Sequence, residues 1–243
     1  MRRIRVYVDA PLATGAHVVL PPFSSEHLTR VLRLPDGAEV VCFNGDGADH
    51  AAILELRGKG AAALRIGARS AAMLESPLAV TLVQAVARGE KMDLILQKST
   101  ELGVARFVPV ISERTEVRLD DERAEKRVAH WQRIVQSACE QCGRARVPMV
   151  EVPVPLARYA EGAMLDTATK LVLHPSGDAL GAVAPGAALT LAVGPEGGFS
   201  ERDLSIFTTA GFGRLRLGPR ILRTETAGIA AIAALQTRFG DLG

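Results

Sequence analysis

The chain has 243 residues, of which 48% are hydrophobic and 23% are charged, and its formal net charge is +2. This composition supports a packed core in one large domain or two smaller ones, and it argues against wholesale disorder. The small net charge gives no global signal for a nucleic-acid partner, and no apolar run is long enough to predict a membrane span.

The N-terminal segment and the cysteines both favour a cytoplasmic protein. Residues 1–5 are basic, but Tyr7, Asp9 and Pro11 interrupt the segment directly after them, which makes a poor secretory signal. Three cysteines cannot form a full disulfide framework, and they suit a reducing compartment.

Residues 3 to about 70 predict a small β-barrel. The Asn44-Gly45-Asp46-Gly47 sequence tolerates positive φ angles and predicts a hairpin, while residues 24–32 predict one short helix. Such a barrel is a binding module without an obvious catalytic constellation. The expected strands cover residues 3–8, 17–20, 39–43, 51–56 and 61–66.

Beyond a small, polar stretch at residues 68–77, strands alternate with helices, which predicts an α/β domain. We therefore expect two domains, 1–72 and 73–243. Pro109 favours a sheet edge for its strand. The expected strands are residues 80–85, 107–110, 148–155 (broken by prolines), 170–173, 189–193 and 214–217, and the expected helices are 90–102, 120–141, one after Ser200 and a long Ala-rich one at the C-terminus.

Two strand-to-helix turns near the C-terminus predict the active site. Residues 194–200 and 218–226 each begin with Gly-Pro after a strand, and ligands of open α/β sheets bind at the carboxyl ends of strands. Glu196 lies in the middle of the first turn, where a purely structural loop needs no carboxylate. The alternatives are an ordinary tight turn for the first, and surface arginines for the second.

The sequence lacks the motifs of nucleotide-phosphate, metal and redox sites. No Rossmann or P-loop pattern is present, and the five histidines lack metal-ligand spacing, so we predict no metal site. Cys139 and Cys142 have the spacing of a redox pair, but they lie at the end of a predicted helix, where the helix dipole would not lower a thiol pKa.

The motifs together resemble the bacterial family of 16S rRNA uracil-N3 methyltransferases, the small subunit methyltransferase E family of the SPOUT class. The resemblance covers nearly the whole chain, except residues 150–169. It rests on residues 97–103 (QKSTELG), 112–114 (SER), 138–144 (ACEQCGR), 173–175 (LHP), 194–198 (GPEGG) and 217–226 (LGPRILRTET), and in the first domain on Arg5 with Tyr7, residues 27–33 (HLTRVLR) and 43–47 (FNGDG).

The resemblance implies a C-terminal SPOUT α/β domain with a deep trefoil knot, preceded by a PUA-like β-barrel that binds RNA. It also implies a homodimer and S-adenosyl-L-methionine bound in the knot. Its substrate would be one uridine in the decoding region of 16S rRNA, within the small ribosomal subunit. The residues that would line the cofactor pocket are Leu173, His174, Val193, Gly194, Gly198, Leu217, Gly218, Ile221 and Leu222.

The reaction requires removal of the uracil N3 proton, stabilisation of the resulting anion, and a methyl group in line with N3. We expect Arg223 to stabilise the anion or to grip a phosphate, and Glu196 to accept the proton or to orient the base. The predicted RNA contacts are Arg5, Arg30, Arg33, Gln141 and Arg144. For Gln141 and Arg144, an alternative is that the partner subunit supplies these two side chains to the site. Two other functions stay open: a SPOUT enzyme acting on another rRNA or tRNA position, and a non-catalytic RNA-binding assembly factor.

Overall fold

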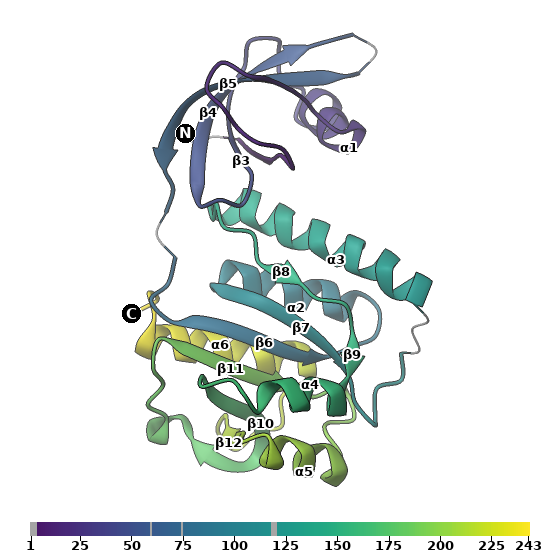
Figure 1. The fold of residues 1–243 in the computed structure, drawn as a ribbon, viewed down its shortest axis with the longest axis vertical. Coiled ribbons are helices and arrows are strands. Elements are labelled where there is room, and N and C mark those ends of the chain that lie inside the picture. The colour runs from purple at the N-terminus through teal and green to yellow at the C-terminus, as the bar shows by residue number, and fades with distance from the viewer. Residues whose placement is uncertain (1–3, 59, 74, 118–120) are drawn as a thin grey trace. The chain divides into compact units, whose positions relative to one another are not determined.

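The computed structural model describes residues 4–58, 60–73, 75–117 and 121–243 (Figure 1). By their internal contacts the residues form two compact units. Unit 1 contains Met1–Glu75 and Gln136–Val147, and unit 2 contains Ser76–Val135 and Pro148–Gly243. The division falls within the long helix α3 (Asp121–Cys142), whose last turns belong to unit 1.

Unit 1 contains a five-stranded sheet in the order β1-β3-β4-β5-β2. The predicted hairpin is confirmed: β3 and β4 pair antiparallel, and Gly45 and Gly47 have φ angles of 93° and 91°. The strands are β1 (Arg5–Tyr7), β2 (His17–Val19), β3 (Glu39–Phe43), β4 (Ala48–Leu56) and β5 (Ala62–Ala71).

One face of this sheet carries the core of unit 1, because alternate residues such as Val40, Leu54 and Leu64 point to the same side. The predicted short helix is confirmed, but in two parts: α1 (Pro22–Glu26) continues directly into a π-helical turn, η1 (His27–Val31). Leu28 is fully buried in the same core.

Unit 2 contains a seven-stranded sheet in the order β12-β10-β11-β6-β7-β8, with β9 also pairing with β7, and its strand pairs are parallel. The prediction of an α/β domain is therefore confirmed. The strands are β6 (Ala79–Ala85), β7 (Val104–Ile111), β8 (Met149–Val150), β9 (Val154–Pro155), β10 (Thr169–Ala179), β11 (Ala188–Val193) and β12 (Gly213–Arg216).

Helices cover both faces of the unit 2 sheet (Figure 1). On one face, α4 (Leu156–Ala163) and α5 (Glu201–Thr209) pack against a core that includes Val83, Ala192 and Phe207. On the other face lie α2 (Glu90–Glu101) and α6 (Thr224–Phe239), which contact each other, while α2 also contacts β7 and α6 contacts β11. A short 3-10 turn, η2 (Leu180–Ala182), follows β10.

Two predictions about strands are wrong. Strand β7 is not at an edge, because it pairs with β6 on one side and with β8 and β9 on the other. The break between those two short strands lies opposite Val108 and Pro109, so a proline is accommodated inside the sheet. Strand β10 does not end at His174 but continues to Ala179 after a shift of register, where a Cβ on Gly177 would lie 2.6 Å from backbone atoms of β12.

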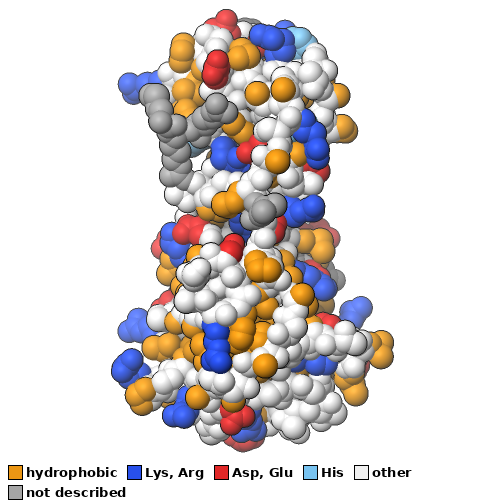
Figure 2. All heavy atoms as spheres, turned by 90° about the vertical axis from the view of Figure 1, so that its left-hand side faces the viewer, with side chains coloured by type: hydrophobic (Ala, Val, Ile, Leu, Met, Phe, Trp, Pro, Cys, Tyr) orange, Lys and Arg blue, Asp and Glu red, His pale blue; other side chains and the backbone are white. Residues whose placement is uncertain are grey.

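The surface of the protein is mixed in character. Figure 2 shows hydrophobic side chains gathered toward the middle of the visible face of unit 2, with many Lys and Arg side chains at its margins. Within the ranges that the structure describes, no helix is long and apolar enough to cross a membrane.

Candidate active site beside strands β10, β11 and β12

A cavity of about 420 Å³ lies in unit 2 where β11 and β12 end, beside residues 173–175 in the middle of β10. Its volume is in the range typical of small-molecule sites. Both Gly-Pro turns contribute to its wall, which confirms that the two turns come together. The cavity is lined by Arg114, residues 173–175, 193–199 and 215–222, Thr224 and Ala227.

All nine residues that the sequence predicts for cofactor binding line this one cavity. They come from the middle of β10 (Leu173 and His174), from the end of β11 and the first turn, and from the second turn with the residue before it. The aliphatic side chains of Leu217 and Leu222 give it apolar surface, and Arg216 and Arg220 supply positive charge. The cavity can therefore hold a ligand that combines an apolar part with an anionic group.

A buried hydrogen-bond network fixes the first turn to the start of α6. The Thr224 hydroxyl donates to the Gly194 carbonyl at 2.6 Å, and Gln84 Nε2 donates to the Thr224 hydroxyl at 3.1 Å. Gln84 lies at the end of β6 and is 1% exposed. Its Nε2 also donates to the carbonyl of Ala85 at 2.9 Å. The network thus joins three segments that are distant in the sequence, and we call it the Gln84–Thr224–Gly194 clamp.

Sequence reasoning missed Gln84. The available signal was a single amide side chain inside an otherwise apolar strand, since a buried polar group is expected to have a partner. Thr224 does not cap α6, because the residue before it, Arg223, occupies the N-cap position, and the Thr224 hydroxyl is used in the clamp instead.

Backbone geometry explains the glycines of the first turn. A Cβ on Gly194 would come within 3.0 Å of the Phe199 nitrogen, so only glycine fits without a shift of the backbone. Gly198 has a φ of 67°, in the left-handed region. Ser200 and Asp203 form a capping box at the start of α5: the Ser200 hydroxyl accepts from the Asp203 amide at 3.1 Å, and the Asp203 carboxylate accepts from the Ser200 amide at 3.0 Å.

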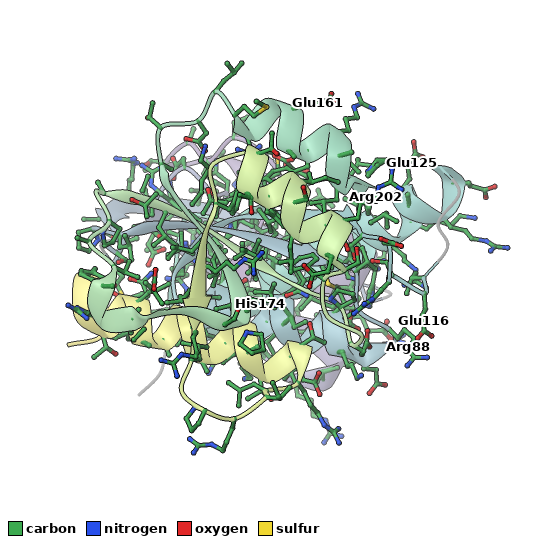
Figure 3. All side chains as sticks on the ribbon, turned by 90° about the horizontal axis from the view of Figure 1, so that it is seen from below. Arg88, Glu116, Glu125, Glu161, His174 and Arg202 are labelled. Atoms are coloured by element: carbon green, nitrogen blue, oxygen red, sulfur yellow. The ribbon has the colours of Figure 1, made fainter. Side chains whose placement is uncertain are left out.

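Glu196 lines the cavity and is held by donors from α2 and the loop before it. Its carboxylate accepts from Lys91 Nζ at 2.9 Å and from the backbone amide of Arg88 at 3.2 Å. Partial desolvation raises the pKa of Glu196, but the Lys91 and backbone hydrogen bonds outweigh this and lower it below its ordinary value. A carboxylate with a lowered pKa is a weak base, so the geometry favours the orienting role over proton abstraction. The Arg88 guanidinium in turn pairs with Glu116 at 2.6 Å, side by side in Figure 3.

We expect Glu196→Gln to weaken cofactor binding by at most about fivefold, because partly exposed ion pairs contribute about 0–1 kcal/mol. Since its folded pKa is lowered, the ion-pair contribution is present above the ordinary carboxyl pKa and is lost only as the pH falls through the lowered value. The pH–rate profile near neutrality should keep its shape in this variant. Glu201→Gln, on an exposed carboxylate of α5, is the matched control. If the acidic limb of the pH–rate profile disappears in Glu196→Gln but not in Glu201→Gln, the proton transfer is assigned to Glu196.

Arg223 is exposed at the N-cap of α6 and is not among the residues that line the cavity. Its neighbours Arg220, Ile221, Leu222 and Thr224 do line it. Arg223 therefore lies at the edge of the site, beside the helix N-terminus, where backbone N–H groups favour an anion. This placement suits a side chain that meets a second substrate rather than one that holds the ligand of the cavity.

His174 enters the cavity wall from the irregular part of β10 and is labelled in Figure 3. The backbone amide of Ser176 donates to His174 Nδ1 at 3.2 Å, and the Ser176 hydroxyl lies 2.8 Å from the same nitrogen. Because a backbone amide can only donate, Nδ1 acts as the acceptor, and the neutral ring carries its proton on Nε2.

The five residues predicted to contact RNA differ in how far their side chains are exposed to solvent. Arg5 pairs with Asp49, and Arg144 pairs with Glu75 at 2.5 Å; their side chains are 11% and 6% exposed. Either arginine would have to leave its carboxylate to reach a phosphate, so the structure favours a structural role for both in unit 1. By contrast, Arg30, Arg33 and Gln141 are exposed or partly exposed.

The cysteine pair lies at the C-terminal end of α3, as the sequence predicts. Cys139 is buried, and its burial raises the pKa of its thiol to about 12. A thiol with this pKa is protonated at neutral pH and unreactive. In the part of the chain that the structure describes, no group of three or more His, Cys, Asp or Glu residues could hold a metal ion.

Comparison with protein families gives two matches. A family described as an RNA methyltransferase domain matches residues 74–236, and a family described as an RNA methyltransferase PUA domain matches residues 24–67. The chain is 34% identical over 241 residues to the ribosomal RNA small subunit methyltransferase E of Buchnera aphidicola, covering 98% of this chain and 97% of that protein. It is 30% identical over 219 residues to the protein of the same name from Bacillus subtilis, covering 86% of this chain and 85% of that protein.

Two solved methyltransferase structures are also similar to this chain. The structure is similar to a putative methyltransferase from Legionella pneumophila in complex with S-adenosylmethionine, with a TM-score of 0.94, 38% identity and full coverage of both chains. It is also similar to a ribosomal RNA small subunit methyltransferase E from Neisseria gonorrhoeae bound to S-adenosylmethionine, with a TM-score of 0.89, 41% identity and full coverage of both chains.

Proposed function

The chain belongs to the RNA methyltransferase family of the ribosomal RNA small subunit methyltransferase E type, and we propose that it methylates N3 of one uridine in the decoding region of 16S rRNA. The methyl donor is S-adenosyl-L-methionine. The observation that carries the proposal is the cavity of about 420 Å³, in which the two glycine turns after β11 and β12 meet the middle of β10.

The residues of the cavity fit this cofactor. Leu173, Leu217 and Leu222 offer apolar contact for the adenine ring, and the open backbone of the Gly194 and Gly218 turns offers amides and carbonyls for its edge. Arg216 or Arg220 suits the carboxylate of the methionine part. S-adenosylmethionine supplies an electrophilic methyl group on a sulfonium sulfur.

The chain's own residues have two tasks in the transfer. Arg223 stabilises the uridinate anion at a carbonyl oxygen as the N3 proton leaves to water, and so lowers the pKa of N3. Glu196, fixed by Lys91, holds the first turn and orients the base. The N3–carbon bond then forms as the sulfur–carbon bond breaks, leaving a neutral thioether.

The proposal includes the finer architecture that the motif resemblance implies. The C-terminal α/β domain contains a deep trefoil knot, and the sheet of unit 1 closes as a PUA-like barrel that binds RNA. The protein works as a homodimer in the cytoplasm on the small ribosomal subunit. Light scattering with and without cofactor tests the dimer.

Mass-spectrometric mapping of methyluridine tests the reaction. Small ribosomal subunits and transfer RNA from a strain that lacks the family's gene are incubated with the protein and S-adenosylmethionine. The expected result is N3-methyluridine at one position of 16S rRNA. Methylation of transfer RNA or of another rRNA position would identify a different SPOUT specificity. Absence of both methylation and calorimetric cofactor binding would indicate a non-catalytic RNA-binding factor.

A further inference from the structure

The helical segment formed by α1 and η1 exposes apolar side chains on its solvent side. Phe23 is 73% exposed and Val31 is 65% exposed, whereas Ser25 and Leu28 on the opposite side are buried in unit 1. A surface helix ordinarily presents polar residues on the side away from the core. Residues four apart share one side of a helix, so Phe23, His27 and Val31 form one exposed stripe.

The backbone beside this stripe departs from ordinary geometry in two ways. Residues His27–Val31 form a π-helical turn, in which the Leu32 amide donates to the His27 carbonyl at 2.9 Å. Arg33 follows with a φ of 52°, in the left-handed region that is unfavourable for a non-glycine residue. Both features are enriched at functional sites. The strain at Arg33 directs the chain away from the helix directly after the stripe.

Positive charge flanks the stripe. The Arg30 side chain is 69% exposed, and it pairs at 3.0 Å with Glu26, a similarly solvated carboxylate on the same helical segment. Arg33 is exposed as well. Such a surface ion pair is weak, so Arg30 can exchange Glu26 for a phosphate at little cost.

We propose that Phe23, with Val31 beside it on the same stripe, forms a platform where an unpaired base of the substrate RNA stacks on the Phe23 ring, while Arg30 and Arg33 contact the adjoining phosphates. This proposal rests on the proposed function for the identity of the ligand, and it adds that unit 1 prefers single-stranded RNA. Aromatic side chains beside arginines are the recurring means of binding unpaired nucleotides. A protein partner is disfavoured, because one aromatic and one valine side chain fall far short of the roughly 800 Å² that each side of a stable protein interface buries.

Two RNA probes test the platform. The affinity of the full chain is measured for a single-stranded oligouridine and for a blunt RNA duplex of the same length, at fixed salt. Phe23→Ala should weaken oligouridine binding by about 5- to 150-fold, the range for loss of one stacked base, and should leave duplex binding nearly unchanged. Phe23→Trp should retain oligouridine binding. Leu165→Ala, which removes an 87% exposed leucine from unit 2, is the matched control and should change neither affinity.

Loss of Arg30 or Arg33 should affect RNA binding differently from loss of Phe23. Arg30→Ala and Arg33→Ala should each weaken the binding of both RNA probes. Each should also reduce the slope of log affinity against log salt concentration, because each removes a phosphate contact. Equal binding of oligouridine by Phe23→Ala and wild type would overturn the platform, and so would equal losses for the two probes. Weaker binding to whole small subunits with unchanged binding to both RNA probes would point to a protein contact and would also overturn it.

Methyl transfer by the wild type to small subunits is measured in parallel. If that transfer is absent, the proposed function fails, whatever the probes show. If it is present and Phe23→Ala binds oligouridine as the wild type does, only the platform fails.

Discussion

Replacing Arg223 with alanine is expected to lower kcat for methyl transfer by about 10²- to 10³-fold, the range for loss of one donor to a developing anion. Cofactor affinity should stay largely intact, because Arg223 is outside the cavity wall. Folding should also be preserved, since Arg223 is exposed and its side chain makes no capping hydrogen bond at the start of α6. The measurements are single-turnover methyl transfer to small subunits and calorimetric titration with S-adenosylmethionine.

Two further variants separate the possible roles of this arginine. Arg220→Ala makes the same change three residues earlier, at a position that lines the cavity, and should raise the cofactor Kd more than it lowers kcat. Arg223→Lys keeps the charge but not the planar fork of donors, so its kcat should fall between those of the wild type and Arg223→Ala. Near-normal turnover by Arg223→Ala would remove Arg223 from the mechanism.

Local signals in the sequence predicted most of the elements around the site, because those elements depend on nearby residues. The apolar run at residues 189–193 forms β11, and the serine and aspartate three residues apart form the capping box of α5. The Gly-Pro dipeptides mark the turns, and the rule that ligands bind at strand ends predicted that both turns contribute to one site. This reasoning needed no knowledge of distant contacts.

Distant pairings could not be predicted in this way. Gln84 and Thr224 are 140 residues apart, and neither has a local feature that identifies the other as its partner. Arg5 and Arg30 are each followed by a valine in the sequence, yet only Arg5 is largely buried, because Asp49 on β4 lies beside it. The edge prediction for β7 failed for the same reason, since β8 and β9 follow it in the chain only after the long α3.

The Gln84–Thr224–Gly194 clamp carries the second large prediction. Thr224→Val preserves the shape of the side chain but removes the hydroxyl that donates to Gly194 and accepts from Gln84. Thr224 is only 6% exposed, so water cannot easily replace the lost bonds. Leaving buried polar groups without partners costs about 1–3 kcal/mol, so the free energy of unfolding should fall by this amount. Because the Gly194 turn loses its anchor, the cofactor Kd should rise about tenfold, which corresponds to about 1.4 kcal/mol.

Thermal unfolding and calorimetric titration measure the two effects. Thr224→Ser keeps the hydroxyl and should restore cofactor affinity even if some packing is lost. Thr208→Val is the matched control, because it removes a hydroxyl that bonds within α5, to the Leu204 carbonyl at 2.8 Å, and should leave cofactor binding unchanged. If Thr224→Val binds the cofactor as tightly as the wild type, the glycine geometry of the first turn is sufficient to shape the cavity, and the clamp contributes to stability alone.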